Sequence, residues 1–195
     1  MSHQQRLVDI VRASRRMMTV LRAMRDQDLP QWRLFAGAVY QTVWNGLTGR
    51  DPDYGVRDYD VIYFDPDTSW NAEDVVIRRV AAAMPDAFRD AVEVRNQSRV
   101  HLWFPQKFGR PYARQFTADE ALERAVATVH AVGVRLEADD SLSIAAPFGL
   151  DDLFDLRFRA GPGGDDPAVV AAKAEAARVR WPEVTIDPTP WTPAA

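Results

Sequence analysis

Two acidic residues, Asp58 and Asp60, stand two positions apart at the start of an apolar run in residues 56–65. Alternate residues of a β-strand point to the same face, so both carboxylates project together, while Tyr59 and Val61 point to the opposite face. Two like charges this close destabilise the folded chain unless a cation lies between them. A divalent ion is the usual solution when both carboxylates stay ionised, so this pair predicts a metal site.

The composition restricts which metal such a site can hold. The chain of 195 residues contains no cysteine, which excludes disulfides, thiolate zinc sites and cysteine nucleophiles. Its three histidines, His3, His101 and His130, are scattered and lack the spacing of metal ligands. The ligands are therefore expected to be oxygen atoms, which favours Mg²⁺ or Mn²⁺ over zinc.

A second unusual feature is a stretch without acidic residues. Residues 94–118 contain no Asp or Glu, whereas the whole chain carries a net charge of −4. The stretch contains five cationic residues: Arg95, Arg99, Lys107, Arg110 and Arg114. This cationic island in an acidic chain predicts a local anionic partner, because binding of a long nucleic acid would normally need a more extensive basic surface.

The elements that position these residues follow from hydrophobic periodicity. The first half of the chain predicts a helix over 5–26, a short strand from residue 32, a turn at Gly37 and a helix over 39–47. A strand over 58–64, a helix over 72–84 and a third strand around Glu93 follow. Helices that alternate with strands predict an α/β (α+β) fold in which helices cover a mixed β-sheet.

The second half of the chain is less regular. An apolar run over 99–104 predicts a further strand, and Thr117 with Glu120 forms a capping box that opens a helix to about residue 130. A hairpin over 131–148, a short helix that runs into a strand over 149–159, and an alanine-rich helix over 168–181 complete the chain. The acidic group Asp151, Asp152 and Asp155 starts the short helix and is interpreted as structural.

The order of these parts resembles the nucleotidyltransferase superfamily typified by DNA polymerase β. More closely, AGAVYQTVWNGLTGR, DYDVIYFD, VEVRNQSRVHLWF and APFGLDDLFDL resemble a family of bacterial nucleotidyltransferase-like proteins. The resemblance covers about residues 30–181. It implies a polymerase β-like core over 30–160 within a single domain over 1–195, preceded by an N-terminal helix over 1–29 and followed by a linker, C-terminal helix and tail over 161–195.

The resemblance also implies roles for individual residues. Asp58 and Asp60 would hold metal ions, and Glu93 on the neighbouring strand would complete the catalytic metal site. The glycine turn, Gly37 and Ala38, would receive the triphosphate through backbone N–H groups at a helix start. Ala38 departs from the usual second glycine or serine of that turn, so a serine hydroxyl contact is absent there.

The cationic island follows Glu93 directly, where phosphates would need positive charge. Arg95, Arg99 and Lys107 are therefore candidates for nucleotide binding, and interleaved aromatic residues could stack on a base or belong to the core. These aromatic residues are Trp103, Phe104, Phe108, Tyr112 and Phe116.

Two functions follow from this pattern. The first is Mg²⁺- or Mn²⁺-dependent transfer of a nucleoside monophosphate from a nucleoside triphosphate to a hydroxyl acceptor, which could be a small molecule, a protein or an RNA end. The alternative is a non-catalytic nucleotide-binding or protein-interaction module that retains the fold. Neither a membrane nor a long nucleic acid is an expected partner. The chain has no apolar stretch of roughly 20 residues and no signal peptide, so a cytoplasmic location is expected.

Overall fold

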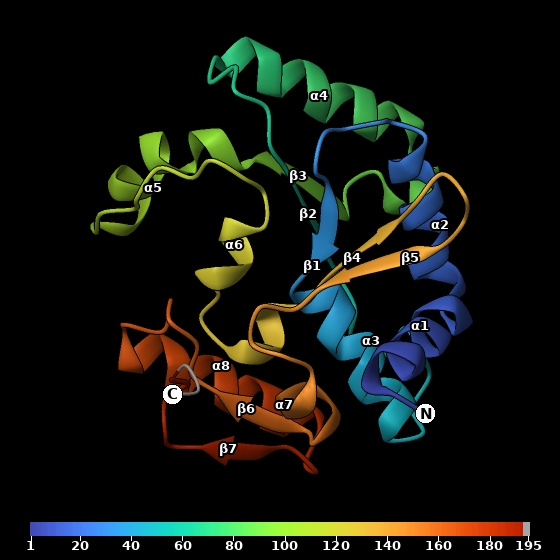
Figure 1. Cartoon of the computed structure of the whole chain (residues 1–195), viewed down its shortest axis with the longest axis vertical. Helices are drawn as coiled ribbons and strands as arrows, with labels where there is room; N and C mark the ends of the chain where they lie inside the picture. The colour runs from blue at the N-terminus through green and yellow to red at the C-terminus, as the bar shows by residue number, and fades with distance from the viewer. Residues whose placement is uncertain (193–195) are drawn as a thin grey trace.

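The computed structural model describes residues 1–192 and contains a five-stranded mixed sheet (Figure 1). The strand order is β3-β2-β1-β4-β5, in which β2 and β3 are parallel and the other neighbours are antiparallel. The strands are β1 (Arg33–Phe35), β2 (Tyr59–Tyr63), β3 (Val92–Asn96), β4 (Gly133–Leu136) and β5 (Leu142–Ala145). The predicted mixed sheet with helices is confirmed.

Within residues 1–192, four α-helices precede β3 and four follow it. The first four are α1 (His3–Ala13), α2 (Arg15–Arg25), α3 (Gly37–Leu47) and α4 (Trp70–Ala83). The later four are α5 (Val100–Phe108), α6 (Glu120–Glu123), α7 (Asp151–Phe154) and α8 (Pro167–Arg180). A small parallel pair, β6 (Arg157–Arg159) and β7 (Thr185–Asp187), lies beside α8 in Figure 1. The hairpin, the short helix that leads into a strand, and the final helix are thus confirmed.

The two faces of the sheet have different environments. Tyr59, Val61 and Tyr63 of β2 are almost completely buried and join the main core, which α1 to α4 contribute to. Ile62 points to the other face, where it packs in a smaller apolar cluster with residues of the α6 region. Because side chains alternate along a strand, Asp60 shares this second, less covered face with Ile62.

The predicted helix over 5–26 is wrong at one point, because Ser14 divides it into α1 and α2. The Ser14 hydroxyl accepts a hydrogen bond from the Met17 N–H (3.1 Å) and donates one to Asp53 (3.0 Å). A serine side chain that satisfies a free N–H group starts a new helix, which explains the break within an otherwise continuous apolar pattern.

The predicted strand over 99–104 is also wrong, because these residues continue from a short 3₁₀ turn into α5. Strand β3 ends at Asn96, whose side-chain oxygen accepts a hydrogen bond from the Ser98 N–H (3.2 Å) and so turns the chain. Helix α5 then lies at the periphery of the molecule in Figure 1. A short apolar run fits a strand and a helix equally well, so periodicity did not distinguish them.

The capping box over 117–120 starts a helix that is much shorter than predicted. The Thr117 hydroxyl accepts a hydrogen bond from the Glu120 N–H (3.3 Å), but α6 ends at Glu123. Beyond it, the carbonyl groups of Ala125 and Val126 accept hydrogen bonds from Gly163 (3.2 Å) and Gly161 (2.9 Å). Pairing with this distant loop replaces the helical hydrogen bonds that the sequence predicted.

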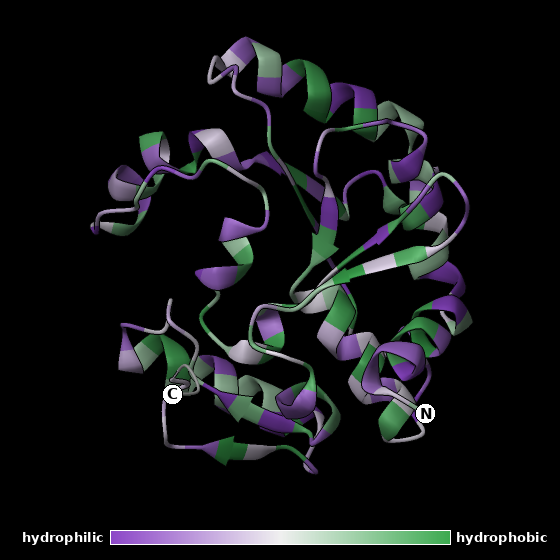
Figure 2. Cartoon of the chain, in the orientation of Figure 1, coloured by the Kyte–Doolittle hydropathy of each residue, from purple (hydrophilic) through white to green (hydrophobic). Residues whose placement is uncertain are grey.

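Hydropathy along the helices agrees with their positions. Figure 2 shows hydrophilic residues interrupting the hydrophobic ones along the long helices. Within residues 1–192, none of the helices has the length and apolar character needed to cross a membrane.

Candidate active site

The three acidic residues identified in the sequence lie in, or directly before, the neighbouring strands β2 and β3. Asp60 in β2 is in register with Glu93 in parallel β3 and with Phe35 in β1. Residues in register on neighbouring strands point to the same face, so Asp60 and Glu93 project together. Asp58 immediately precedes β2 and lies close enough to Asp60 to influence its ionisation.

The electrostatics of Asp60 reflect this arrangement. Burial, together with the nearby charges of Glu93 and Asp58, raises the pKa of Asp60 from 3.8 to about 6. Lys173 and Arg95 act in the opposite direction, but more weakly than burial. The ionised form of Asp60 therefore carries a free-energy penalty that a bound cation would relieve.

The oxygen atoms of these acids suit a hard cation, but the three side chains are not close enough together to coordinate one ion. In residues 1–192, no group of three or more acidic or histidine side chains is close enough to hold a metal ion. Glu93 forms an ion pair with Arg95, whose second guanidinium nitrogen donates to the Val94 carbonyl (2.9 Å). Carboxylate oxygens are hard donors that suit Mg²⁺ or Mn²⁺, so the three acids fit such an ion provided that Glu93 exchanges Arg95 for the cation.

The turn between β1 and α3 has an unusual backbone. Ala36 has φ 53° and ψ −120°, a conformation that is normally accessible only to glycine, and it precedes Gly37, the first residue of α3. The first N–H groups of a helix have no intrahelical acceptor, so Gly37 and Ala38 present donors at this end. The Ala38 side chain is fully buried in the main core, so Ala38 can contact a ligand only through its backbone.

The structure separates the cations that the sequence placed near the phosphates. Arg99 is mostly buried, forms an ion pair with Glu73 and donates from Nε to the Thr68 carbonyl (2.8 Å). Lys107 lies on the exposed side of α5, with its ammonium 5.6 Å from the Trp103 ring centroid and 5.4 Å from that of Phe108. Of Arg95, Arg99 and Lys107, only Arg95 lies beside the acids.

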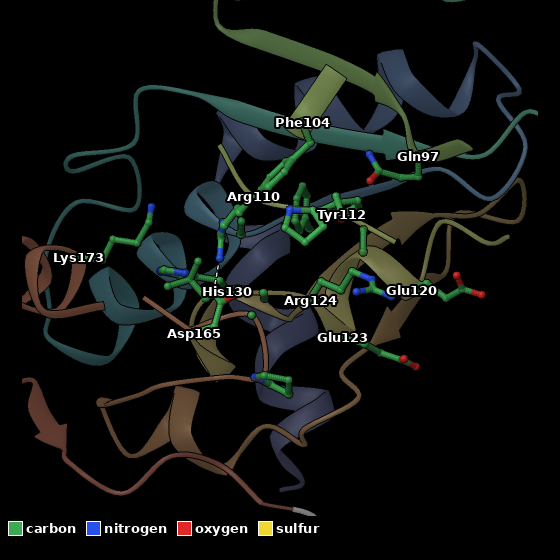
Figure 3. A pocket seen from close by; sticks show the side chains of 18 residues that line it. Gln97, Phe104, Arg110, Tyr112, Glu120, Glu123, Arg124, His130, Asp165 and Lys173 are labelled. Carbon is green, nitrogen blue, oxygen red and sulfur yellow. Dashed lines mark hydrogen bonds and ion pairs between the residues drawn. The ribbon is translucent and has the colours of Figure 1, made fainter. Parts of the chain in front are cut away.

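A cavity of about 800 Å³ opens beside the β1–α3 turn (Figure 3). Phe35 and Ala36 form part of its wall, together with His130, Arg124 and Lys173, which the sequence did not single out as ligand-binding residues. Removal from solvent, with Lys173 nearby, lowers the pKa of His130 to about 3, so its imidazole is neutral at physiological pH. Lys173 belongs to the alanine-rich helix α8 (Pro167–Arg180), and no motif in the surrounding sequence marks it as a ligand-binding residue.

A comparison with known protein families identifies a family that matches most of this chain. A nucleotidyltransferase family matches residues 22–186, a range that includes the β1–α3 turn, all three acids and Lys173. The chain belongs to this nucleotidyltransferase family. The predicted resemblance is therefore confirmed at the level of the family.

The fold is shared with a solved structure of such a protein. An NMR structure described as revealing a CCA-adding enzyme head domain is similar with a TM-score of 0.75 and 24% sequence identity. The similarity covers 94% of this chain and 95% of the other. It confirms the nucleotidyltransferase fold, and a comparison with curated proteins finds no match.

Proposed function

We propose that this nucleotidyltransferase-family protein transfers a nucleoside monophosphate from a nucleoside triphosphate to a hydroxyl acceptor in a Mg²⁺- or Mn²⁺-dependent reaction. The observation that carries the proposal is the register of Asp60 in β2 with Glu93 in β3, with Asp58 directly before β2, where burial and the charges of the other two acids raise the pKa of Asp60. The ionised form of Asp60 is destabilised in this environment, and a bound cation would compensate that penalty.

Metal binding and phosphate binding would be performed by different residues of the chain. Asp58 and Asp60 would hold the metal, and Glu93 would join them once it releases Arg95. A bound divalent ion would supply charge neutralisation for the phosphates. The N–H groups at the start of α3 would bind phosphate oxygens, because a helix N-terminus favours an anion.

The transfer step itself is a substitution at phosphorus. The acceptor oxygen forms a bond to the α-phosphorus as the bond from that phosphorus to the bridging oxygen breaks, and pyrophosphate leaves. The proton of the acceptor hydroxyl passes to Glu93, which is the acid closest in register to Asp60. The acceptor is a hydroxyl compound whose class is left open among small molecules, proteins and RNA ends.

Thermal unfolding with each of the four common nucleoside triphosphates, with and without Mg²⁺, tests the proposal. A ligand that binds only the folded chain raises the unfolding temperature, and the rise should need both components. The variant Asp58→Asn with Asp60→Asn should lose this coupling while its circular dichroism spectrum stays unchanged. Absence of any shift with all four nucleotides would contradict the proposed function.

A non-catalytic nucleotide-binding or protein-interaction module is the second candidate. The observation that favours it is the ion pair between Glu93 and Arg95, which neutralises the acid that would accept the proton. Glu93→Gln distinguishes the two candidates when label transfer from α-labelled nucleotides is measured against a metabolite and lysate acceptor screen. In an enzyme this variant keeps nucleotide binding and loses transfer by orders of magnitude, whereas a binding module shows no transfer even in the wild type.

A further inference from the structure

The cavity beside the acids is built from three distant parts of the chain. Phe35 and Ala36 come from the β1–α3 turn, Phe104 to Val126 supply a second wall, and Pro162 to Lys173 supply a third. Its volume of about 800 Å³ is large enough for one nucleotide-sized ligand. The cavity thus depends on the C-terminal segment as much as on the sheet.

Two of its three cations lack an acidic partner. Arg110 forms an ion pair with Asp165, which joins the second and third walls, and its guanidinium lies 5.3 Å from the Phe104 ring centroid. Arg124 stacks over Tyr112 at 5.4 Å, and neither Arg124 nor Lys173 forms an ion pair within residues 1–192. Their positive charges are therefore available to a ligand.

The acidic residues of the wall form no ion pair with Arg124 or Lys173 within residues 1–192. Glu120 accepts a hydrogen bond from the Phe116 N–H (2.9 Å), which holds its carboxylate at the start of α6. In Figure 3 the carboxylates of Glu120 and Glu123 are directed away from the cavity, whereas Asp165 is paired with Arg110. The two cations without an ion-pair partner, Arg124 and Lys173, therefore favour an anionic ligand.

The cavity adjoins the acidic site through its wall on β1. Phe35 of this wall is in register with Asp60 on the neighbouring strand β2, and the opposite part of the lining includes Lys173. Because it belongs to α8, it reaches the sheet only through the tertiary structure.

We propose that this cavity is the nucleoside triphosphate site and that Lys173 and Arg124, on the C-terminal side of the chain, hold its phosphates. The inference rests on the proposed function, since it identifies the same substrate, but it assigns the phosphates to residues outside the cationic island. Lys107, the candidate from the sequence, does not line the cavity and serves as the matched comparison.

Titration calorimetry with Mg²⁺ and each of the four nucleoside triphosphates tests the assignment. Lys173→Gln and Arg124→Gln should each weaken binding by about tenfold or more, because each removes a charge-assisted hydrogen bond. Lys107→Gln, which removes the same charge from an exposed position on α5, should bind as the wild type does. All three residues are exposed, so unchanged thermal unfolding without nucleotide verifies that each variant folds.

The outcomes separate the two proposals. If the wild type binds a nucleotide and Lys173→Gln and Arg124→Gln bind it equally well, the cavity assignment is overturned. The same holds if Lys107→Gln weakens binding as much as the two cavity variants do. Either result leaves the proposed function standing. Failure of the wild type to bind any of the four nucleotides overturns both. Selective loss in the two cavity variants supports both.

Discussion

Arg99 offers the sharpest test of whether the cationic island is a ligand site or part of the fold. Its side chain is 10% exposed and forms an ion pair with Glu73, which is 2% exposed. Arg99 also donates to the Thr68 carbonyl, and Glu73 accepts a hydrogen bond from the Asn96 N–H (2.9 Å) at the end of β3. This network joins α4 to the strand that contains Glu93.

Arg99→Met should destabilise the protein strongly, because it leaves the Glu73 charge buried without a partner. The removal of one member of a buried ion pair costs about 3–5 kcal/mol. For a chain of this length, each kcal/mol lowers the unfolding temperature by about 2–4 °C, so the expected decrease is roughly 6–20 °C. Thermal and urea unfolding followed by circular dichroism measure both quantities.

A second substitution tests whether the lost charge is the cause. Arg99→Met combined with Glu73→Gln removes both charges and keeps a side-chain oxygen for the Asn96 N–H, so it should recover at least about 1 kcal/mol of the loss. Arg114→Met, an exposed cation of the same island, should change stability by no more than about 0.5 kcal/mol. An Arg99→Met variant as stable as the Arg114 control would refute the structural role and return Arg99 to the candidates for nucleotide binding.

Three further predictions concern the turn, the acids and the C-terminal segment. Ala36→Gly should raise the free energy of unfolding by about 1 kcal/mol in urea titrations, because glycine adopts the φ of 53° without strain; a loss of stability would contradict this reasoning. Asp60→Asn should stabilise the metal-free protein more at neutral than at acidic pH. The folded-state pKa of about 6 exceeds the unfolded value, so wild-type stability falls as the pH rises between about 4 and 6 and then stays lower, by up to about 3 kcal/mol. Urea unfolding across this pH range measures the difference in stability between the wild type and Asp60→Asn. If the stability of both proteins changes in the same way with pH, Asp60 is not the group responsible. Trp181→Ala should cost about 3–5 kcal/mol in urea unfolding, because this fully buried ring packs against Trp44 and donates to Asn45 (2.9 Å), whereas Trp181→Phe should cost less; a negligible loss with Ala would show that the C-terminal segment is not anchored there.

The sequence alone was sufficient for the parts of the molecule that depend on local pattern. Alternation along a strand placed Asp60 on the face opposite Tyr59 and Val61, and the strand–helix–strand order placed Glu93 on a neighbouring strand. Helical spacing and turn residues likewise predicted α3, α4, α8 and the β4–β5 hairpin. Each of these features arises from interactions between residues close in the chain, whose periodicity remains visible in the sequence.

Where the local sequence is compatible with more than one backbone conformation, the tertiary structure decided which one forms. The apolar run after β3 forms α5 instead of a strand because Asn96 turns the chain there. The segment after α6 stops being helical because its carbonyl groups pair with Gly161 and Gly163. Neither partner can be inferred from periodicity, since one depends on a side-chain hydrogen bond and the other on a distant loop.

Tertiary packing also decided which cations lie near the acids. Five positive charges close together in the sequence suggested one phosphate site, but burial directs Arg99 to Glu73 and exposure places Lys107 above aromatic rings on α5. Lys173, which had no signal in the sequence, lines the cavity because Ala174 and Ala177 of its helix α8 pack into the main core. A charge acts on whatever lies within a few ångströms of it in space, and distance along the chain does not determine that neighbourhood.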